Sequence, residues 1–202
     1  MTLGQGYLGG GTKGGHSTHP SGKLFVRQEL HCNLKSMFGM DSDTLIKITR
    51  IGAKRAVAST TELVVPPEVY RETVKEGKEG GFPDAFEIEQ NFRERSLKVT
   101  ETPRTGEVEA MVRELGMKGG EADLFRLFRA QGCRVVVSDD QEFLDLVREL
   151  GVPFVTSSAL LIYVWRMGGV GRDECVKLLE RLRPMVSEEE YELSVRELEG
   201  EN

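Results

Sequence analysis

The stretch Gly119–Phe143, GGEADLFRLFRAQGCRVVVSDDQEF, contains the pattern that decides the fold. Apolar residues recur at helical spacing from Leu124 to Phe128, which predicts a helix with one buried face. We expect Gly132 to end this helix, because glycine tolerates the left-handed conformation of a C-cap. The β-branched run Arg134–Val137 is too short for a helix and suits a buried parallel strand. The stretch therefore predicts a helix, a tight turn and a buried strand in succession.

Acidic residues lie at both ends of this helix–strand unit. Glu121 and Asp123 fall in the first turn of the helix, and the strand is followed by Ser138, Asp139 and Asp140. In open α/β sheets, ligands bind at the carboxyl ends of the strands. We therefore expect the two acidic clusters to share a cation.

The rest of the chain continues the alternation of short strands and helices. Strands are predicted at Ser36–Met40, Leu63–Val65, Leu97–Val99, Arg134–Val137 and Phe154–Thr156. Helices are predicted at Leu45–Ala56, Pro66–Val74, Pro83–Phe92, Glu107–Leu115, Phe143–Leu150, Ala159–Trp165, Asp173–Leu182 and after Ser187, with a charged loop at Lys75–Gly81. This order predicts an α/β fold with three layers, in which helices cover both faces of a central parallel sheet of four to five strands.

Length and composition indicate one compact domain with an extension. The chain has 202 residues, of which 39% are hydrophobic, enough for a single core. Residues 1–35 are rich in Gly, Ser and Thr, so we expect a flexible N-terminal extension and a single domain over residues 36–200. The net charge of −6 argues against a strongly basic nucleic-acid module, although acids gathered around a metal give the same sum.

The chain shows no sign of export or membrane insertion. There is no run of eighteen apolar residues and no signal peptide, so we expect no membrane partner and a cytoplasmic location. The three cysteines form no CxxC pair and are expected to be inert thiols in a reducing compartment.

Four acids occupy equivalent places beside the predicted strands, namely Asp41, Glu72, Asp123 and Asp140. Carboxylates that converge at one sheet edge repel each other and need a cation, and oxygen ligands suit Mg²⁺ or Mn²⁺. Such ions activate water for attack on a phosphodiester, so no Ser, Cys or His nucleophile is required. The alternative is that each acid only caps a helix. For four acids in this arrangement, a shared site is the stronger interpretation.

Four segments resemble, in order, the motifs of PIN-domain ribonucleases. FGMDSDTLIK is similar to the opening strand and its aspartate, and VVPPEVYRETV to the second motif with Glu72 in a helix. GGEADLFRLF resembles the third motif with Asp123 in the ligand position, and VVVSDDQEF the fourth, whose Ser/Thr-x-Asp-x-x-Phe pattern selects Asp140. GVPFVTSSALL resembles the last strand and helix, so that the resemblance spans about Met37 to Leu182.

The resemblance implies a PIN-like fold and a metal-dependent nuclease, usually of RNA. In this interpretation the catalytic residues, which hold Mg²⁺ or Mn²⁺, are Asp41, Glu72, Asp123 and Asp140. Auxiliary ligands or groups that orient the site would be Asp43, Glu121, Ser138 and Asp139. Many members of the family are toxins neutralised by an antitoxin protein, and others process RNA. RNA is thus the implied substrate and an antitoxin a possible partner.

Two surfaces are candidates for contacts with partners. The residues considered for binding RNA phosphates are Lys47, Arg50, Lys54 and Arg71. The first three can share one helix face, although an ordinary solvated face is the alternative. The apolar helix Ala159–Trp165, together with the final helix, could form a homodimer interface.

Two other functions are consistent with parts of the sequence. Asp41-Ser-Asp43-Thr44 resembles the DxDxT opening of haloacid-dehalogenase-like phosphatases, in which Asp41 would be a covalent nucleophile and Asp43 a general acid. Leu45 stands where that motif requires Thr or Val. A PIN-like module without catalysis, which binds RNA or protein, is the second alternative. The presence of all four acids favours the nuclease over both.

Overall fold

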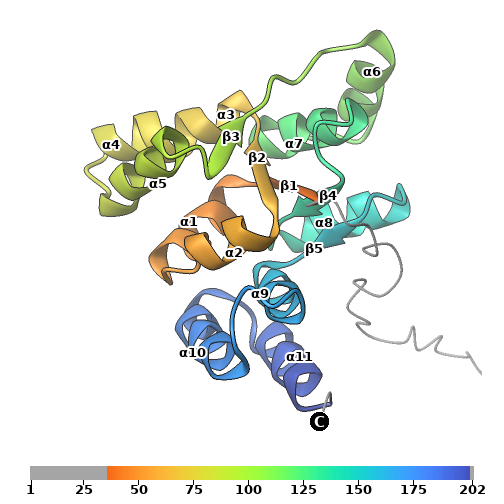
Figure 1. The fold of residues 1–202 in the computed structure, drawn as a ribbon. Coiled ribbons are helices and arrows are strands. Elements are labelled where there is room, and N and C mark those ends of the chain that lie inside the picture. Colours follow the sequence, from red (N-terminus) through yellow and green to blue (C-terminus); the bar gives the residue numbers. More distant parts are fainter. Residues whose placement is uncertain (1–35, 201–202) are drawn as a thin grey trace, which may run out of the picture.

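A five-stranded, fully parallel sheet forms the centre of the protein, as described by a computed structural model of residues 36–200 (Figure 1). The strands are β1 Met37–Met40, β2 Glu62–Val65, β3 Leu97–Val99, β4 Val135–Val137 and β5 Phe154–Val155. Their order in the sheet is β3-β2-β1-β4-β5. The chain therefore reverses direction across the sheet between β1 and β4, where ligands bind in doubly wound folds.

Helices connect consecutive strands. Between β1 and β3 lie α1 Ser42–Arg50, α2 Lys54–Thr60, α3 Pro67–Tyr70, the π-helical turn η1 Arg71–Glu76, α4 Gly77–Glu79 and α5 Pro83–Arg93. Between β3 and β5 lie α6 Gly106–Glu114, α7 Gly119–Arg129 and α8 Gln141–Glu149. The chain ends with α9 Ser157–Arg166, α10 Arg172–Leu182, the 3₁₀ turn η2 Arg183–Met185 and α11 Glu188–Glu199.

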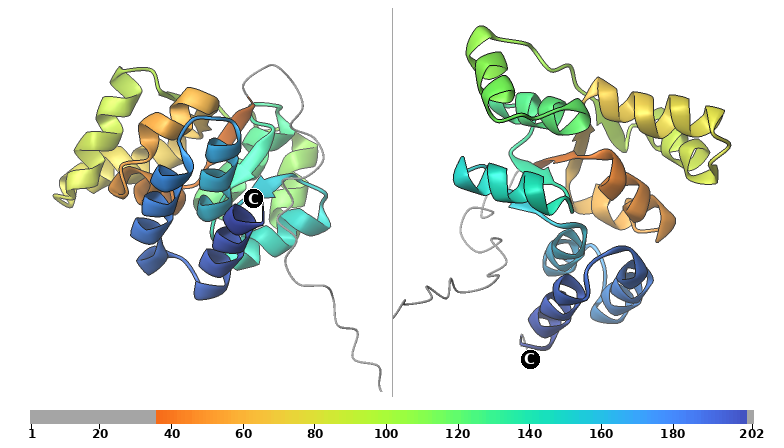
Figure 2. Two further views of the ribbon diagram at one scale, coloured as in Figure 1. Left: turned by 60° about the horizontal axis from the view of Figure 1, so that its bottom comes forward. Right: turned by 180° about the vertical axis from the view of Figure 1, so that it is seen from behind.

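The strands send alternate side chains into two separate cores. Phe38 and Met40 of β1 join the core under α1, α2 and α9, whereas Val136 of β4 joins the core under α6, α7 and α8. Figure 2 shows these helix groups on opposite sides of the sheet. Period-two alternation between two covered faces is what the predicted three-layer α/β/α architecture requires, and that architecture is confirmed.

Glycine at position 39 lets a helix approach the central strand. A Cβ at Gly39 would lie 2.8 Å from Cys133 Sγ and 2.9 Å from Leu124 Cδ1. Both neighbours are buried, so the space is already filled. Gly39 thus supports close packing of α7 on β1, although glycine is a poor strand former.

Three local predictions are corrected. The helix expected at Leu45–Ala56 is two helices, because Gly52 adopts a positive φ of 76° between them. The segment Lys75–Gly81 is not a loop, since η1 and α4 continue the helix to Glu79. After α7 the left-handed residue is Gln131, whereas Gly132 is needed because a Cβ there would lie 2.4 Å from Leu127 Cδ1.

The apolar helix expected to mediate dimerisation is internal. Every residue of α9 from Ser157 to Val164 is buried, and the helix contacts α1, α2, α10 and α11. These neighbours account for its apolar character, so α9 offers no free face for a second copy. Within residues 36–200, no helix is long and apolar enough to cross a membrane.

Candidate metal centre at the carboxyl edge of the sheet

Asp41 lies directly after β1, at the point where β1 pairs with β4. Its backbone N–H donates to the carbonyl of Val137 at 3.2 Å, and its Oδ1 accepts from the backbone N of Thr44 at 2.7 Å. Burial raises the pKa of Asp41, and repulsion by Asp139 acts in the same direction, against the lowering effect of hydrogen bonds from Ser138 and Thr44. Asp41 is thus both the N-cap of α1 and a carboxylate that lacks a full counter-charge.

Asp140 occupies the matching position after β4. It caps α8 by accepting from the backbone N of Phe143 at 3.0 Å. Its own N–H donates to Ser138 Oγ at 3.2 Å, and the Ser138 side chain also bonds to Asp41. Ser138 is fully buried and therefore joins the ends of the two central strands.

Glu72 reaches the same edge from the π-helical turn η1. Ser42, the residue after Asp41, donates a hydrogen bond from its hydroxyl to Glu72 Oε2. A Cβ at Gly120 in the first turn of α7 would lie 3.8 Å from that same oxygen. Glu72 is therefore held between the start of α1 and the start of α7. Turns of π-helix occur frequently at functional sites because they re-aim single side chains.

Glu121 is the residue of α7 that faces the acidic edge. Burial raises the pKa of Glu121, followed by repulsion from Asp140, Asp41 and Glu142. Glu121 therefore senses the charges of the acids that follow β1 and β4. The sequence predicted it only as an auxiliary group, and no ion pair to Glu121 is found among the described residues.

Asp123 is directed into a different network. Its Oδ1 accepts from Arg126 Nη1 at 2.6 Å, and the same guanidinium binds both carboxylate oxygens of Glu109 in α6, at 2.6 and 3.0 Å. The Arg126 side chain is only 9% exposed, so this group of charges locks α6 onto α7. The predicted ligand Asp123 therefore has a cation partner already. The spacing of Asp123 and Arg126 by three residues was the sequence signal for this pair.

Asp139 and Asp43 are bound to Lys47. Asp139 accepts from Lys47 Nζ at 2.8 Å and from the backbone N and hydroxyl of Ser157, both at 2.7 Å. Asp43 is largely exposed and pairs with the same ammonium group. Burial lowers the pKa of Lys47, but the hydrogen bonds to Asp139 and Asp43 outweigh it, so that the net shift is upward. Both aspartates therefore already have a cationic partner in Lys47.

The candidate residues for RNA contacts are all ion-paired. Lys47 points inward to Asp139, Arg50 pairs with Asp84 at 3.2 Å, and Lys54 pairs with Glu87 at 2.8 Å. Arg71 binds Glu68 and Glu76. Arg50 and Arg71 remain about half exposed, whereas Lys47 is 12% exposed. The prediction that Lys47, Arg50 and Lys54 share one helix face is wrong, because Lys54 lies in α2 and Lys47 points inward; whether any of these residues binds RNA stays a prediction.

The four carboxylates Asp41, Glu72, Glu121 and Asp140 have the chemistry of a divalent-ion site. They offer only oxygen donors, which suits Mg²⁺ or Mn²⁺. Burial raises the pKa of Asp41 and of Glu121, and repulsion by neighbouring carboxylates adds to this effect. In the part of the chain that the structure describes, no three His, Cys, Asp or Glu side chains converge closely enough to hold an ion as they stand. The donor types fit a divalent ion, and in this structure Asp41 and Asp140 use their Oδ1 atoms to cap α1 and α8.

The parallel α/β sheet thus carries acids after two neighbouring strands, β1 and β4, at the edge where such folds bind ligands. A family model described as a PIN domain matches residues 37–199. The chain belongs to the PIN-domain family, whose members are generally nucleases that use divalent metal ions. No curated protein and no solved structure matches the chain. The predicted family is confirmed. The family match gives no support to the haloacid-dehalogenase-like alternative.

Proposed function

We propose that the protein is an Mg²⁺- or Mn²⁺-dependent ribonuclease that hydrolyses RNA phosphodiester bonds at the carboxyl edge of the sheet. The observation that carries the proposal is the pairing of β1 with β4, in which Met40 lies opposite Val137, so that Asp41 and Asp140 follow neighbouring strand ends. Ser42 holds Glu72 at the start of α1, and repulsion from Asp140 and Asp41 adds to burial in raising the pKa of Glu121. Carboxylates that repel one another are stabilised when a cation binds between them.

In this proposal the ion is held by Asp41, Glu72, Glu121 and Asp140. When bound, it would supply positive charge to the phosphate oxygens and lower the pKa of a water nucleophile. Ser42 and Ser138 orient their neighbouring carboxylates through the hydrogen bonds to Glu72 and Asp41. Asp123 is replaced by Glu121 in this set, because Asp123 is already paired with Arg126.

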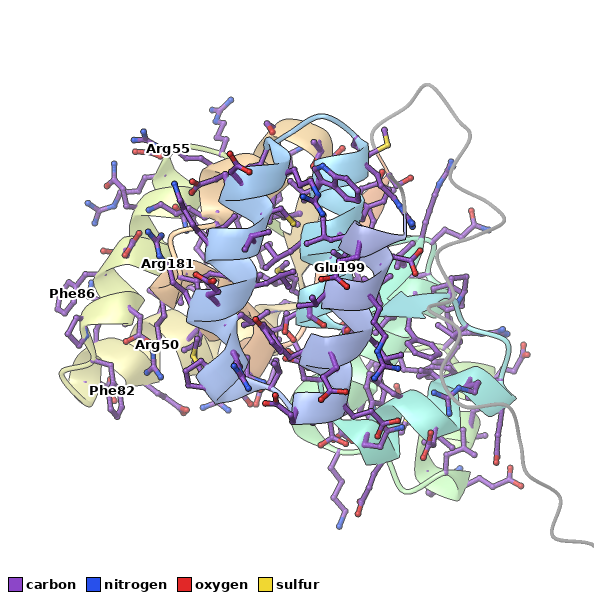
Figure 3. All side chains as sticks on the ribbon, turned by 90° about the horizontal axis from the view of Figure 1, so that it is seen from below. Arg50, Arg55, Phe82, Phe86, Arg181 and Glu199 are labelled. Carbon is purple, nitrogen blue, oxygen red and sulfur yellow. The ribbon has the colours of Figure 1, made fainter. Side chains whose placement is uncertain are left out.

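Positive charge for the RNA backbone would come from Arg71, which adjoins Glu72 in the chain, and from Arg50 at the C-terminal end of α1. Arg50 and Arg71 are about half exposed, and each is engaged in surface ion pairs. Exposed pairs of this kind contribute little stability, so these side chains can exchange a carboxylate for a phosphate at small cost. Phe82 and Phe86 also project into solvent from the start of α5 (Figure 3) and present rings on which bases can stack.

The test is cleavage of a labelled single-stranded RNA by purified protein with Mn²⁺ or Mg²⁺, with EDTA in a parallel reaction. We expect cleavage that requires the metal, and a loss of about a hundredfold or more in Asp140→Asn, since the cluster then lacks one anionic ligand. Asp145→Asn, which changes an exposed acid on α8 that pairs with Arg148, is the matched control and should keep full activity.

Each outcome of this experiment distinguishes the candidate functions. Cleavage that persists in EDTA, or full turnover by Asp140→Asn, would place the chemistry elsewhere. RNA binding without cleavage under any metal condition would favour the non-catalytic PIN-like module. The possible antitoxin partner is tested separately, because a protein that inhibits cleavage should co-purify with the chain at a fixed ratio and release activity when it is removed.

A further inference from the structure

The network around Asp139 connects three elements behind the acidic cluster. Lys47 extends from α1, Asp139 follows β4, and Ser157 begins α9. The side chain of Asp139 is 5% exposed and that of Lys47 is 12% exposed, and Ser157 is fully buried. Buried charges persist only when they are paired and hydrogen-bonded, so this arrangement is a fixed part of the fold.

The oxygens of Asp139 are almost fully used. Oδ1 accepts the backbone N–H of Ser157, and Oδ2 accepts both the ammonium of Lys47 and the hydroxyl of Ser157. A carboxylate offers about four acceptor positions, and a divalent ion at Oδ2 would be repelled by the ammonium only 2.8 Å away. Asp139 is thus poorly suited to ligate a metal, although it adjoins Asp140 in the chain.

We propose that Lys47, Asp139 and Ser157 are positioning residues, which fix the distance between Asp41 and Asp140 without contacting the ion or the RNA. Lys47 lies on the helix that Asp41 caps, and Asp139 immediately precedes the N-cap of α8. The ion pair therefore joins the two helix starts that carry these carboxylates. The inference rests on the proposed function, because it assigns the role of a support to residues beside the proposed ligands.

Two mechanisms give opposite results when Lys47 is changed to methionine. If the ammonium acted only through its charge, its removal would make the cluster more negative and Mn²⁺ would bind more tightly. If it positions the carboxylates, Mn²⁺ should bind about tenfold more weakly, as is typical when a group that orients a ligand is lost. Ser157→Ala removes a support of Asp139 without changing any charge and should also weaken binding, by about threefold to tenfold.

The experiment is a calorimetric titration of Mn²⁺ into the full-length protein without RNA, with thermal unfolding measured for each variant. Lys98→Met is the matched control, because Lys98 is 54% exposed and pairs with Glu62 at the far edge of the sheet. The double variant Lys47→Met/Ser157→Ala should lose less than the product of the single losses, since both residues act through Asp139.

Weaker Mn²⁺ binding in both single variants, with a loss in the double variant smaller than their product and with the control unchanged, supports the inference. Tighter or unchanged binding in Lys47→Met overturns it, and so does unchanged binding in Ser157→Ala, which remains informative if the Lys47 variant fails to fold. A wild-type protein that binds no Mn²⁺ overturns the proposed function and this inference together. Wild-type binding with additive single losses overturns the inference alone.

Discussion

Replacement of Gly39 by alanine should destabilise the protein, although alanine normally favours an ordered backbone. The added Cβ would lie 2.8 Å from Cys133 Sγ, 2.9 Å from Leu124 Cδ1 and 3.1 Å from Cys133 Cβ. Cys133 is 2% exposed and Leu124 is fully buried. Neither neighbour can move into solvent, so the strain must be absorbed by the packing between β1 and α7.

The expected loss follows from two opposing effects. Insertion of a methyl group into a filled core costs about 1–3 kcal/mol. Gly39 does not have a positive φ, so alanine recovers about 0.4–1 kcal/mol by reducing the entropy of the unfolded chain. The net destabilisation is therefore about 1–2 kcal/mol, or roughly 2–8 °C in the melting temperature for a domain of this size.

Urea unfolding followed by circular dichroism measures this loss, and two further variants test its cause. Gly106→Ala is the control, because no atom lies within 4 Å of its Cβ, and it should gain about 0.5 kcal/mol. In a Cys133→Ala background the cost of Gly39→Ala should fall by about half, since the nearest atom is gone. A Gly39→Ala protein as stable as wild type, or an undiminished cost in the Cys133→Ala background, would refute the packing argument.

Four further substitutions test the site and its surroundings. Glu121→Gln should weaken Mn²⁺ binding about tenfold or more, while Asp123→Asn should leave it within about threefold, measured by calorimetry. The folded-state pKa of Glu121 is raised above its usual value of 4.5, so the Glu121 carboxyl binds its proton more tightly in the folded than in the unfolded protein. The free energy of unfolding therefore falls as the pH rises from the unfolded-state pKa through the folded-state pKa. In metal-free buffer Glu121→Gln should therefore melt higher than wild type at about pH 7.5, and the difference should disappear near pH 4. Arg126→Met should lower the melting temperature by several degrees, whereas the exposed Arg148→Met should change it by about 1 °C or less.

The sheet was predictable because its strands depend on local composition. The apolar, β-branched segments at β2 and β4 allow little except a buried strand, and their observed bounds differ from the predicted ones by a residue. The helical conformation from Lys75 to Glu79 was missed for the opposite reason. Its sequence is polar and rich in glycine, and Gly77 packs closely against Ala85 of α5, a tertiary contact that no local pattern shows.

The positions of the candidate acids were only partly predictable. Asp41 and Asp140 follow the paired strands β1 and β4, as their places in the sequence predict, and Ser42 joins Glu72 to the start of α1; that these acids form one site stays a prediction. The choice between Glu121 and Asp123 depends on Glu109 in α6, which binds Arg126 seventeen residues away. The inward direction of Lys47 depends on Asp139, which is separated from it by 92 residues. Tertiary contacts of this kind decide which of two neighbouring charges serves the site.

The π-helical turn Arg71–Glu76 makes the length of this segment more important than its composition. A π turn holds one more residue than an α turn, so removal of a single residue such as Lys75 would restore a regular α-helix. Positions before the deletion would then rotate by about 100° relative to those after it. Gly77 packs so closely on Ala85 that a Cβ added to it would lie 2.9 Å from the Ala85 Cβ. The segment after the deletion is therefore held in place, and the rotation would carry Glu72 away from Ser42. A one-residue deletion here would make the helix regular and would remove Glu72 from the proposed metal site.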